Sequence, residues 1–236
     1  MEYKDFEKLF VEELLKNNID NISEIKKFYD YMKILLEWNK KINLTAINDE
    51  KEFIVKHFID SLTIRKYLKD NNNVIDIGTG AGFPGIPLKI STESINMTLI
   101  DSVNKKVNVL NDIINKLNIE RIEAIHIRAE EFAKNNREKY DVAVSRAVAN
   151  MSTLVEYLIS FVKIGGMIIC MKGPNFGQEL DESKKAISVL GGKIKSVETV
   201  FIDNEFERNI VVIEKIKHTP LKFPRGQSKP LKDPIK

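Results

Sequence analysis

A glycine-rich stretch at residues 76–85 constrains the fold of this chain more than any other feature. Its sequence is Asp76-Ile77-Gly78-Thr79-Gly80-Ala81-Gly82-Phe83-Pro84-Gly85. The apolar run at 73–75 predicts a buried strand before it, and the run at 86–90 indicates the first turns of a helix after it. Glycines at such a junction let backbone N–H groups and the helix N-terminus approach a ligand without Cβ atoms in the way. The stretch therefore predicts a loop that binds a nucleotide-type cofactor.

Two acids near this loop indicate the class of cofactor. The spacing of Gly80, Gly82 and Gly85 fits the G-x-G-x-x-G pattern of dinucleotide-binding loops. However, a carboxylate at Asp76 disfavours a doubly negative pyrophosphate and suits the cationic S-adenosylmethionine. Asp101 closes the next apolar run, where an acid can accept hydrogen bonds from ribose hydroxyls in either cofactor class. Asp76 therefore favours the methyl donor, and Asp101 is compatible with both.

The composition is that of an ordinary globular protein. The chain has 236 residues, of which 43% are hydrophobic and 30% charged, enough for one large domain or a domain with an appendage. It has no apolar signal core at its start and no run of about 18 apolar residues, so we expect a cytoplasmic protein. The single cysteine, Cys170, lies in an apolar run and is expected in the core, and no metal site is expected.

Strand and helix patterns alternate after an all-helical beginning. We expect a helical cap at residues 1–70 and a cofactor-binding domain at 71–215, in which the alternation predicts a mostly parallel sheet with helices on both faces. The expected strands are 73–77, 97–101, 122–127, 140–145 and 166–171, and the expected helices 85–92, 104–118, 129–137, 150–162 and 177–190.

The last part of the chain departs from this alternation. The strand runs 193–202 and 209–215 have only a short connection, so they must be antiparallel. Such a final hairpin on a seven-stranded α/β sheet is typical of class I methyltransferases. Residues 216–236 hold four of the seven prolines and predict an extended arm. From 215 to 236 there are seven Lys or Arg and one acid, a net charge of +6, so the rest of the chain carries −3.

Residues at the ends of the later strands suggest the chemistry. Ala129 and Glu130 begin a helix, where an acid complements the helix dipole or, alternatively, both residues approach adenine. Arg146 follows the fourth strand and is placed to donate to guanine O6 or to the cofactor; a surface ion pair is the alternative. No base and no Asn/Asp-Pro-Pro-Tyr motif follows that strand. A methyl acceptor that needs no deprotonation, such as guanine N7, fits this absence.

Several cations are candidates for contact with RNA phosphates. Lys172 ends the fifth strand at the same sheet edge, and Arg208 lies between the last strands, where it can also be a charged turn residue. In the arm, Lys222, Arg225 and Lys229 suit phosphates, although a solubilising tail has the same composition. Earlier in the chain, His57 and Asp60 have the i, i+3 spacing of a local helix contact.

Several motifs recur together along the chain. They are Trp38-Asn39-Lys40, Asn43-Leu44-Thr45, His57 with Asp60-Ser61, residues 76–87, Leu99-Ile100-Asp101-Ser102, Arg128-Ala129-Glu130-Glu131, Ser145-Arg146-Ala147 and Lys172-Gly173. Taken together, these motifs resemble the bacterial glucose-inhibited division protein B (RsmG) family, which methylates guanine N7 in the 530 loop of small-subunit ribosomal RNA. The resemblance implies an S-adenosylmethionine site at Gly78, Phe83, Asp101, Ala129, Glu130 and Arg146. The family's Pro-Arg-Lys-x-Gly is Pro224-Arg225-Gly226-Gln227-Ser228 here, so its glycine is missing or displaced.

The expected division of labour follows from the residues and the resemblance together. Asp76, Gly78 and Gly80 position the methionine part of the cofactor, Asp101 its ribose, and Ala129 and Glu130 its adenine. Arg146 acts at the transfer site. The partner is 16S ribosomal RNA within the small subunit, methylated at guanine 527. Two other classes stay open from the residues alone: a nicotinamide-dependent oxidoreductase, which shares the glycine loop, and a non-catalytic RNA-binding module, which needs only the basic arm.

Overall fold

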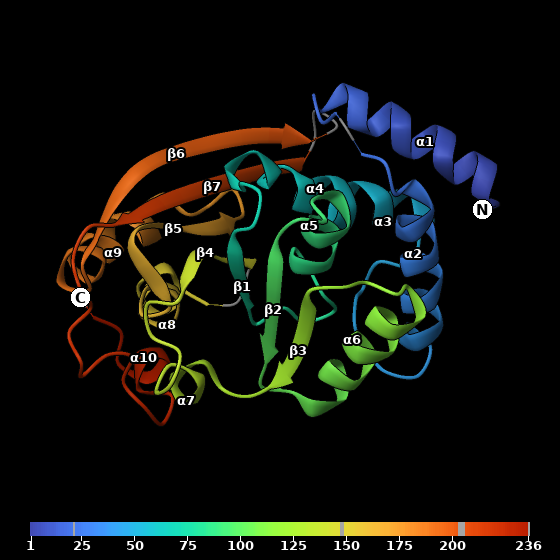
Figure 1. Cartoon of the computed structure of the whole chain (residues 1–236). Coiled ribbons are helices and arrows are strands. Elements are labelled where there is room, and N and C mark those ends of the chain that lie inside the picture. The colour runs from blue at the N-terminus through green and yellow to red at the C-terminus, as the bar shows by residue number, and fades with distance from the viewer. Residues whose placement is uncertain (21, 147–148, 203–205, 236) are drawn as a thin grey trace.

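A seven-stranded sheet forms the centre of the computed structural model, which describes residues 1–20, 22–146, 149–202 and 206–235 (Figure 1). The strand order is β3-β2-β1-β4-β5-β7-β6. β1 to β5 pair in parallel, and β7 pairs antiparallel with both β5 and β6. The strands are β1 Asn73–Ile77, β2 Asn96–Asp101, β3 Ile122–His126, β4 Tyr140–Arg146, β5 Val162–Lys172, β6 Gly192–Ile202 and β7 Phe206–Lys215. The predicted α/β class and the antiparallel last hairpin are confirmed.

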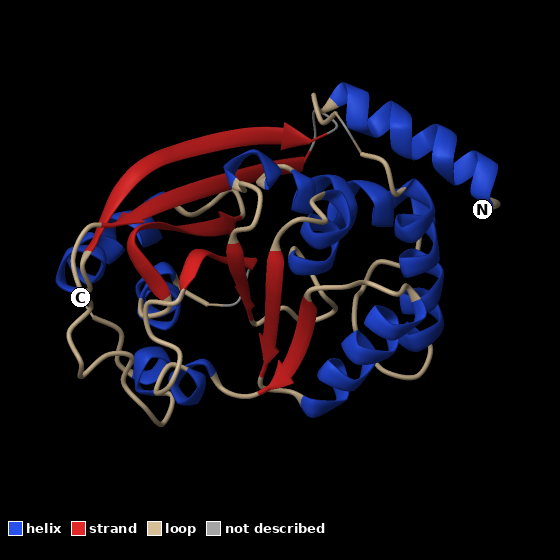
Figure 2. Ribbon diagram, viewed as in Figure 1, coloured by secondary structure: helices blue, strands red, loops and turns tan. Residues whose placement is uncertain are grey.

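Helices cover both faces of the sheet, as Figure 2 shows. Neighbouring strand residues point to opposite faces, so Val74 packs with the N-terminal helices, α5 and α6, while Ile75 packs with α8 and α9. The helices are α1 Tyr3–Lys16, α2 Ile25–Asn39, α3 Glu50–Phe53, α4 Asp60–Leu62, α5 Gly85–Ser91, α6 Asn104–Lys116, α7 Ala129–Phe132, α8 Met151–Ile159, α9 Gly177–Val189 and α10 Lys229–Lys232, with a π-helix η1 at Ile54–Ile59 and a 3-10 turn η2 at Arg65–Tyr67.

The helices of the predicted cap share one apolar cluster with the sheet. Phe28 and Phe58 lie in the same buried cluster as Val74 and Leu99 of β1 and β2. The cap therefore contributes to the core that supports the strand ends. None of the helices among the described residues is long and apolar enough to cross a membrane.

The parallel register brings the carboxyl ends of β1, β2 and β3 to one edge. Ile77 pairs with Ile100, and Asp101 pairs with His126. The strand order reverses between β1 and β4, the position where open α/β sheets form their ligand crevice. The glycine loop that follows β1 therefore opens at this crevice.

Three sequence predictions need correction. The helix expected at 129–137 is the short α7, and the arm is not simply extended, because it contains α10 and docks on the body. Phe223 is buried, and Arg137 donates to the carbonyl oxygens of Phe223 and Thr219. Arg208 lies within β7 and is buried, so its interpretation as a charged turn residue is wrong.

Candidate functional site

The carboxylate of Asp76 organises the glycine loop. Its Oδ2 accepts hydrogen bonds from Thr79 Oγ1 (2.7 Å) and from the backbone N–H of Gly85 (2.9 Å). Its Oδ1 is buried and has no hydrogen-bond partner among the described residues. Burial raises the pKa of Asp76 to about 7. A buried oxygen without a donor leaves this carboxylate suited to a cation or to a water molecule that bridges to one.

The loop itself needs glycine at defined positions. Gly80 and Gly82 have φ angles of +63° and +102°, which other L residues rarely adopt. At Gly82 a Cβ would also lie only 2.6 Å from the hydroxyl oxygen of Tyr31. Tyr31 donates that hydroxyl to the carbonyl oxygen of Ala81 at 2.7 Å, so α2 of the cap fixes the loop from outside.

Asp101 connects the ends of β1 and β2. Its Oδ2 accepts from the backbone N–H of Gly80 at 2.9 Å, and its Oδ1 accepts from that of Val103 at 2.9 Å. The second acid predicted from sequence is therefore in direct contact with the glycine loop.

A pocket of about 120 Å³ lies over these strand ends. Its lining includes Gly78, Asp101, Ala129 and Glu130, which come from three successive strand–helix junctions. The lining is Ile77, Gly78, Ile100, Asp101, Ser102, Ile127, Arg128, Ala129, Glu130 and Tyr157. Its acids and apolar walls are the groups that a ribose and an adenine require.

Arg146 lies at the end of β4, beside the loop rather than in the pocket lining. Its guanidinium carbon is 5.0 Å from the ring centroid of Phe83. Its Nη1 donates to Asp60 Oδ2 (2.9 Å) and to the carbonyl oxygen of Lys56 (3.0 Å). Asp60 also accepts from Arg208, at 2.6 Å to Oδ1 and 2.8 Å to Oδ2. The fully buried Asp60 thus holds two guanidinium groups. Ala147, the next residue of the sequence motif, lies outside the described residues.

His57 completes this cluster and is neutral. Its ring stacks on Phe83, with centroids 4.3 Å apart, and its Nδ1 lies 3.1 Å from Arg146 Nη2. Because a guanidinium only donates, Nδ1 is the acceptor, and Nε2–H donates to Thr45 Oγ1 at 2.8 Å. Burial, followed by the charge of Arg146, lowers the pKa of His57 to about 3. The interpretation of His57 and Asp60 as a local helix contact misses their shared partner, Arg146.

The predicted phosphate-binding cations differ in their surroundings. Lys172 contacts the carbonyl oxygen of Ala149 (2.8 Å) and Glu179 (2.6 Å), and Arg208 is buried against Asp60. Arg225 binds Glu156 of α8 through its main-chain N–H and its guanidinium. By contrast, Lys222 and Lys229 are exposed on the arm.

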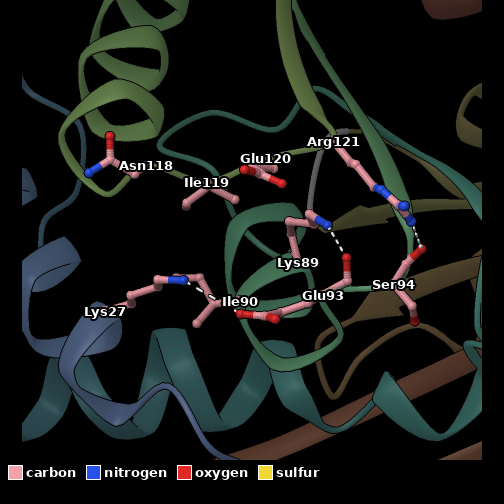
Figure 3. Close-up of a pocket in the computed structure, with 9 residues that line it drawn as sticks. All are labelled: Lys27, Lys89, Ile90, Glu93, Ser94, Asn118, Ile119, Glu120 and Arg121. Atoms are coloured by element: carbon pink, nitrogen blue, oxygen red, sulfur yellow. Dashed lines mark hydrogen bonds and ion pairs between the residues drawn. The ribbon is translucent and has the colours of Figure 1, made fainter.

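A larger cavity, about 410 Å³, lies at the amino-terminal ends of β2 and β3, away from the glycine loop. Figure 3 shows its cations directed at groups of the chain itself. Lys89 donates to the carbonyl oxygens of Glu93 (2.5 Å) and Ile95 (2.8 Å), and Lys27 pairs with the Glu93 carboxylate. Lys89 and Lys27 therefore serve local structure in this cavity.

Comparisons with known proteins agree with this geometry. A family model described as rRNA small subunit methyltransferase G matches residues 24–211. The ribosomal RNA small subunit methyltransferase G of Clostridium novyi is 47% identical, over 97% of this chain and 98% of that protein. The protein of the same name from Clostridium beijerinckii is 50% identical, over 90% and 91%.

Solved structures share the fold at low sequence identity. An rRNA methylase from Streptococcus thermophilus has a TM-score of 0.51 and 17% identity, covering 67% of this chain and 95% of its own. A precorrin-6y C5,15-methyltransferase from Geobacter metallireducens has a TM-score of 0.54 and 13% identity, covering 75% and 95%. These similarities support the class I methyltransferase fold alone.

Proposed function

The chain belongs to the rRNA small subunit methyltransferase G family, as its motifs predict, and from this premise we propose that it methylates guanine N7 at guanine 527, in the 530 loop of 16S ribosomal RNA. S-adenosylmethionine is the proposed donor, and its sulfonium supplies an electrophilic methyl group. We expect the protein in the cytoplasm, where its ribosomal substrate is assembled.

The single observation that carries the cofactor proposal is the buried, unpartnered Oδ1 of Asp76, the residue directly before Ile77 and Gly78 of the pocket lining. A pyrophosphate would bring negative charge toward this carboxylate, whereas a cationic cofactor compensates it. This disfavours the nicotinamide alternative. In the proposal, the methionine part of the cofactor contacts Asp76, Gly78 and Gly80. Asp101 accepts hydrogen bonds from the ribose hydroxyls, and Ala129 and Glu130 contact the adenine.

Transfer to guanine N7 requires alignment and no general base, since the N7 lone pair carries no proton. The cluster around Arg146 fits this requirement, because both ring nitrogens of His57 are already in hydrogen bonds. Arg146 Nε–H makes no hydrogen bond to a described residue, and in the proposal the guanidinium donates to guanine O6. Phe83, whose ring contacts both His57 and Arg146, borders the same site.

The RNA must present an unstacked guanine to this site. Lys222 and Lys229 on the arm are the exposed cations proposed for phosphate contact. Lys172, Arg208 and Arg225 stay candidates from sequence, but their charges are already matched by Glu179, Asp60 and Glu156. Their proposed contribution is therefore to shape the surface that the RNA meets.

Isothermal titration calorimetry with S-adenosylhomocysteine, with NAD as control, tests the cofactor. We expect binding of the first alone, and loss of binding in Asp76→Ala. Binding of NAD alone would reject the proposal, and binding of neither would favour the non-catalytic RNA-binding module.

Labelled methyl transfer to small subunits that lack the modification then tests the reaction. Chain cleavage specific for 7-methylguanine should map to guanine 527, and Arg146→Ala should lose transfer while it keeps S-adenosylhomocysteine binding.

A further inference from the structure

The C-terminal arm returns to the wall of the pocket. The backbone N–H of Ser228 donates to Glu130 Oε1 at 3.3 Å, and Arg128 Nη2 donates to the Ser228 hydroxyl. Arg128 and Glu130 both line the pocket, although Ser228 itself does not. Figure 1 shows the arm, with α10, beside α7, the helix that begins with Ala129 and Glu130. The arm therefore lies directly behind two pocket residues.

The turn that carries Ser228 is fixed on both sides by α8. Before it, Arg225 binds the fully buried carboxylate of Glu156, with its main-chain N 2.8 Å from Oε1 and its Nη2 2.7 Å from Oε2. After it, Thr153 Oγ1 donates to the carbonyl oxygen of Pro230 at 2.8 Å. α8 also contributes Tyr157 to the pocket lining. Hence the arm and the pocket share one rigid support.

These contacts leave Glu130 with one oxygen bound and one available. Oε1 accepts from Arg128 Nε at 3.0 Å and from Ser228 N, whereas Oε2 accepts no hydrogen bond from a described residue. Glu130 is only 7% exposed, so its carboxylate has little freedom to turn. A carboxylate held in this way presents Oε2 to a donor in the pocket, such as the exocyclic amino group of an adenine.

We propose that the turn Gly226-Gln227-Ser228 is a positioning element of the adenine pocket, which sets cofactor affinity and the preference for the adenine amino group by holding Glu130. This inference rests on the proposed function, because it takes S-adenosylmethionine as the ligand. Ser228 acts through Glu130 and is therefore a positioning residue. The basic arm then serves the cofactor as well as the RNA.

The test measures S-adenosylhomocysteine affinity by calorimetry in three forms of the chain. The first ends at Arg225, which keeps Phe223 and the Glu156 contact. The second carries Ser228→Pro, which removes the N–H donor and the hydroxyl that Arg128 binds, and which also disrupts the turn, since proline cannot adopt the φ of +56° found at Ser228. The third, Lys217→Ala with Lys232→Ala, removes exposed charges near the C-terminus that make no contact with Glu130 and serves as the control. We expect Kd to rise about tenfold in the first two and to stay within about twofold in the control.

Two further measurements distinguish an effect of the arm on the position of Glu130 from a general loss of folded structure. In a Glu130→Ala background, the truncation should cause no additional loss, since the arm acts through that carboxylate. S-inosylhomocysteine, in which a keto oxygen replaces the adenine amino group, should bind the intact and truncated chains equally. An equal loss for both ligands, or the same loss without Glu130, would overturn the inference, as would unchanged affinity in Ser228→Pro. Failure of the intact chain to bind S-adenosylhomocysteine would instead reject the proposed function itself.

Discussion

Asp60 is a single buried carboxylate shared by two arginines that come from different strands. It accepts from Arg146 at the end of β4 and from Arg208 on β7. Burying three charges is favourable only while each is matched, and removal of the acid leaves both guanidinium groups without their partner. The orientation of Arg146 at the proposed transfer site therefore depends on Asp60.

We predict that Asp60→Asn lowers the free energy of unfolding by about 3–5 kcal/mol, because it breaks a buried charge network. Asp30→Asn is a matched control, since Asp30 forms an exposed i, i+4 pair with Lys26 and should change stability by less than about 1 kcal/mol. Urea denaturation of both variants measures the difference. Equal effects would contradict the role assigned to Asp60.

The raised pKa of Asp76 predicts that folding stability and cofactor binding depend on pH in opposite directions. Because the folded pKa of about 7 exceeds the ordinary value of 3.8, the stability that this group contributes is fully present below pH 3.8 and is lost as pH rises through about 7. Cofactor binding follows the opposite course, since the ionised carboxylate stabilises the ammonium group of the ligand, which S-adenosylhomocysteine keeps although it lacks the sulfonium. We predict that S-adenosylhomocysteine binds about tenfold more weakly at pH 6 than at pH 8. Calorimetry of Asp76→Asn should show weaker binding without this pH dependence; an unchanged dependence would assign it to another group.

At the scale of elements, the junction between β1 and α5 is tightly packed. A Cβ on Gly85, the first residue of α5, would meet Leu99 Cδ2 of β2 and lie 2.9 Å from Asp76 Oδ2. The glycine therefore lets the helix start against the carboxylate that the loop surrounds.

We predict that Gly85→Ala destabilises the fold by about 1–3 kcal/mol through overpacking and also weakens S-adenosylhomocysteine binding, because Asp76 must move. Gly173→Ala is the matched control, since a Cβ there has no heavy atom within 4 Å. Thermal unfolding and calorimetry on both variants check the two effects. If Gly85→Ala kept full cofactor affinity, the link between helix packing and Asp76 would be wrong.

The sequence allowed the elements to be predicted better than the contacts between them. Apolar runs located the five parallel strands, and the glycines located the loop, because these signals are local. By contrast, the cluster around Arg146 was missed, since Asp60 and Arg208 are 148 residues apart. β7 begins at Phe206, before the apolar run at 209–215, so Arg208 resembled a turn residue. The binding of Arg225 to Glu156 has no local signal at all.

At the scale of the whole molecule, charge is distributed unevenly. The segment from 215 to 236 carries +6 against −3 in the rest of the chain. In Figure 1 its helix α10 lies across the molecule from α2. This asymmetry predicts that RNA meets the side of the molecule where the arm lies.

We predict that Lys222→Ala with Lys229→Ala weakens RNA binding. The variant should also reduce the magnitude of the negative slope of log affinity against log salt concentration by about 1 to 2, since two phosphate contacts are lost. Lys26→Ala on α2, combined with Lys40→Ala directly after that helix, should leave the slope unchanged. Filter binding of small-subunit RNA over a range of salt concentrations measures both. A change of slope in the α2 variant alone would move the RNA surface to the cap.

The sharing of Asp60 also limits how early the cluster around Arg146 can be complete during synthesis of the chain. A nascent chain has made β1 to β4 and the glycine loop well before Arg208 leaves the ribosome, so a parallel sheet can form while Asp60 still lacks its second arginine. Closing a loop of about 150 residues is slow compared with the local pairing of neighbouring strands. The site around Arg146 is therefore complete only after β7 has formed, and a chain interrupted before β7 has the glycine loop without the arginine that completes the proposed transfer site.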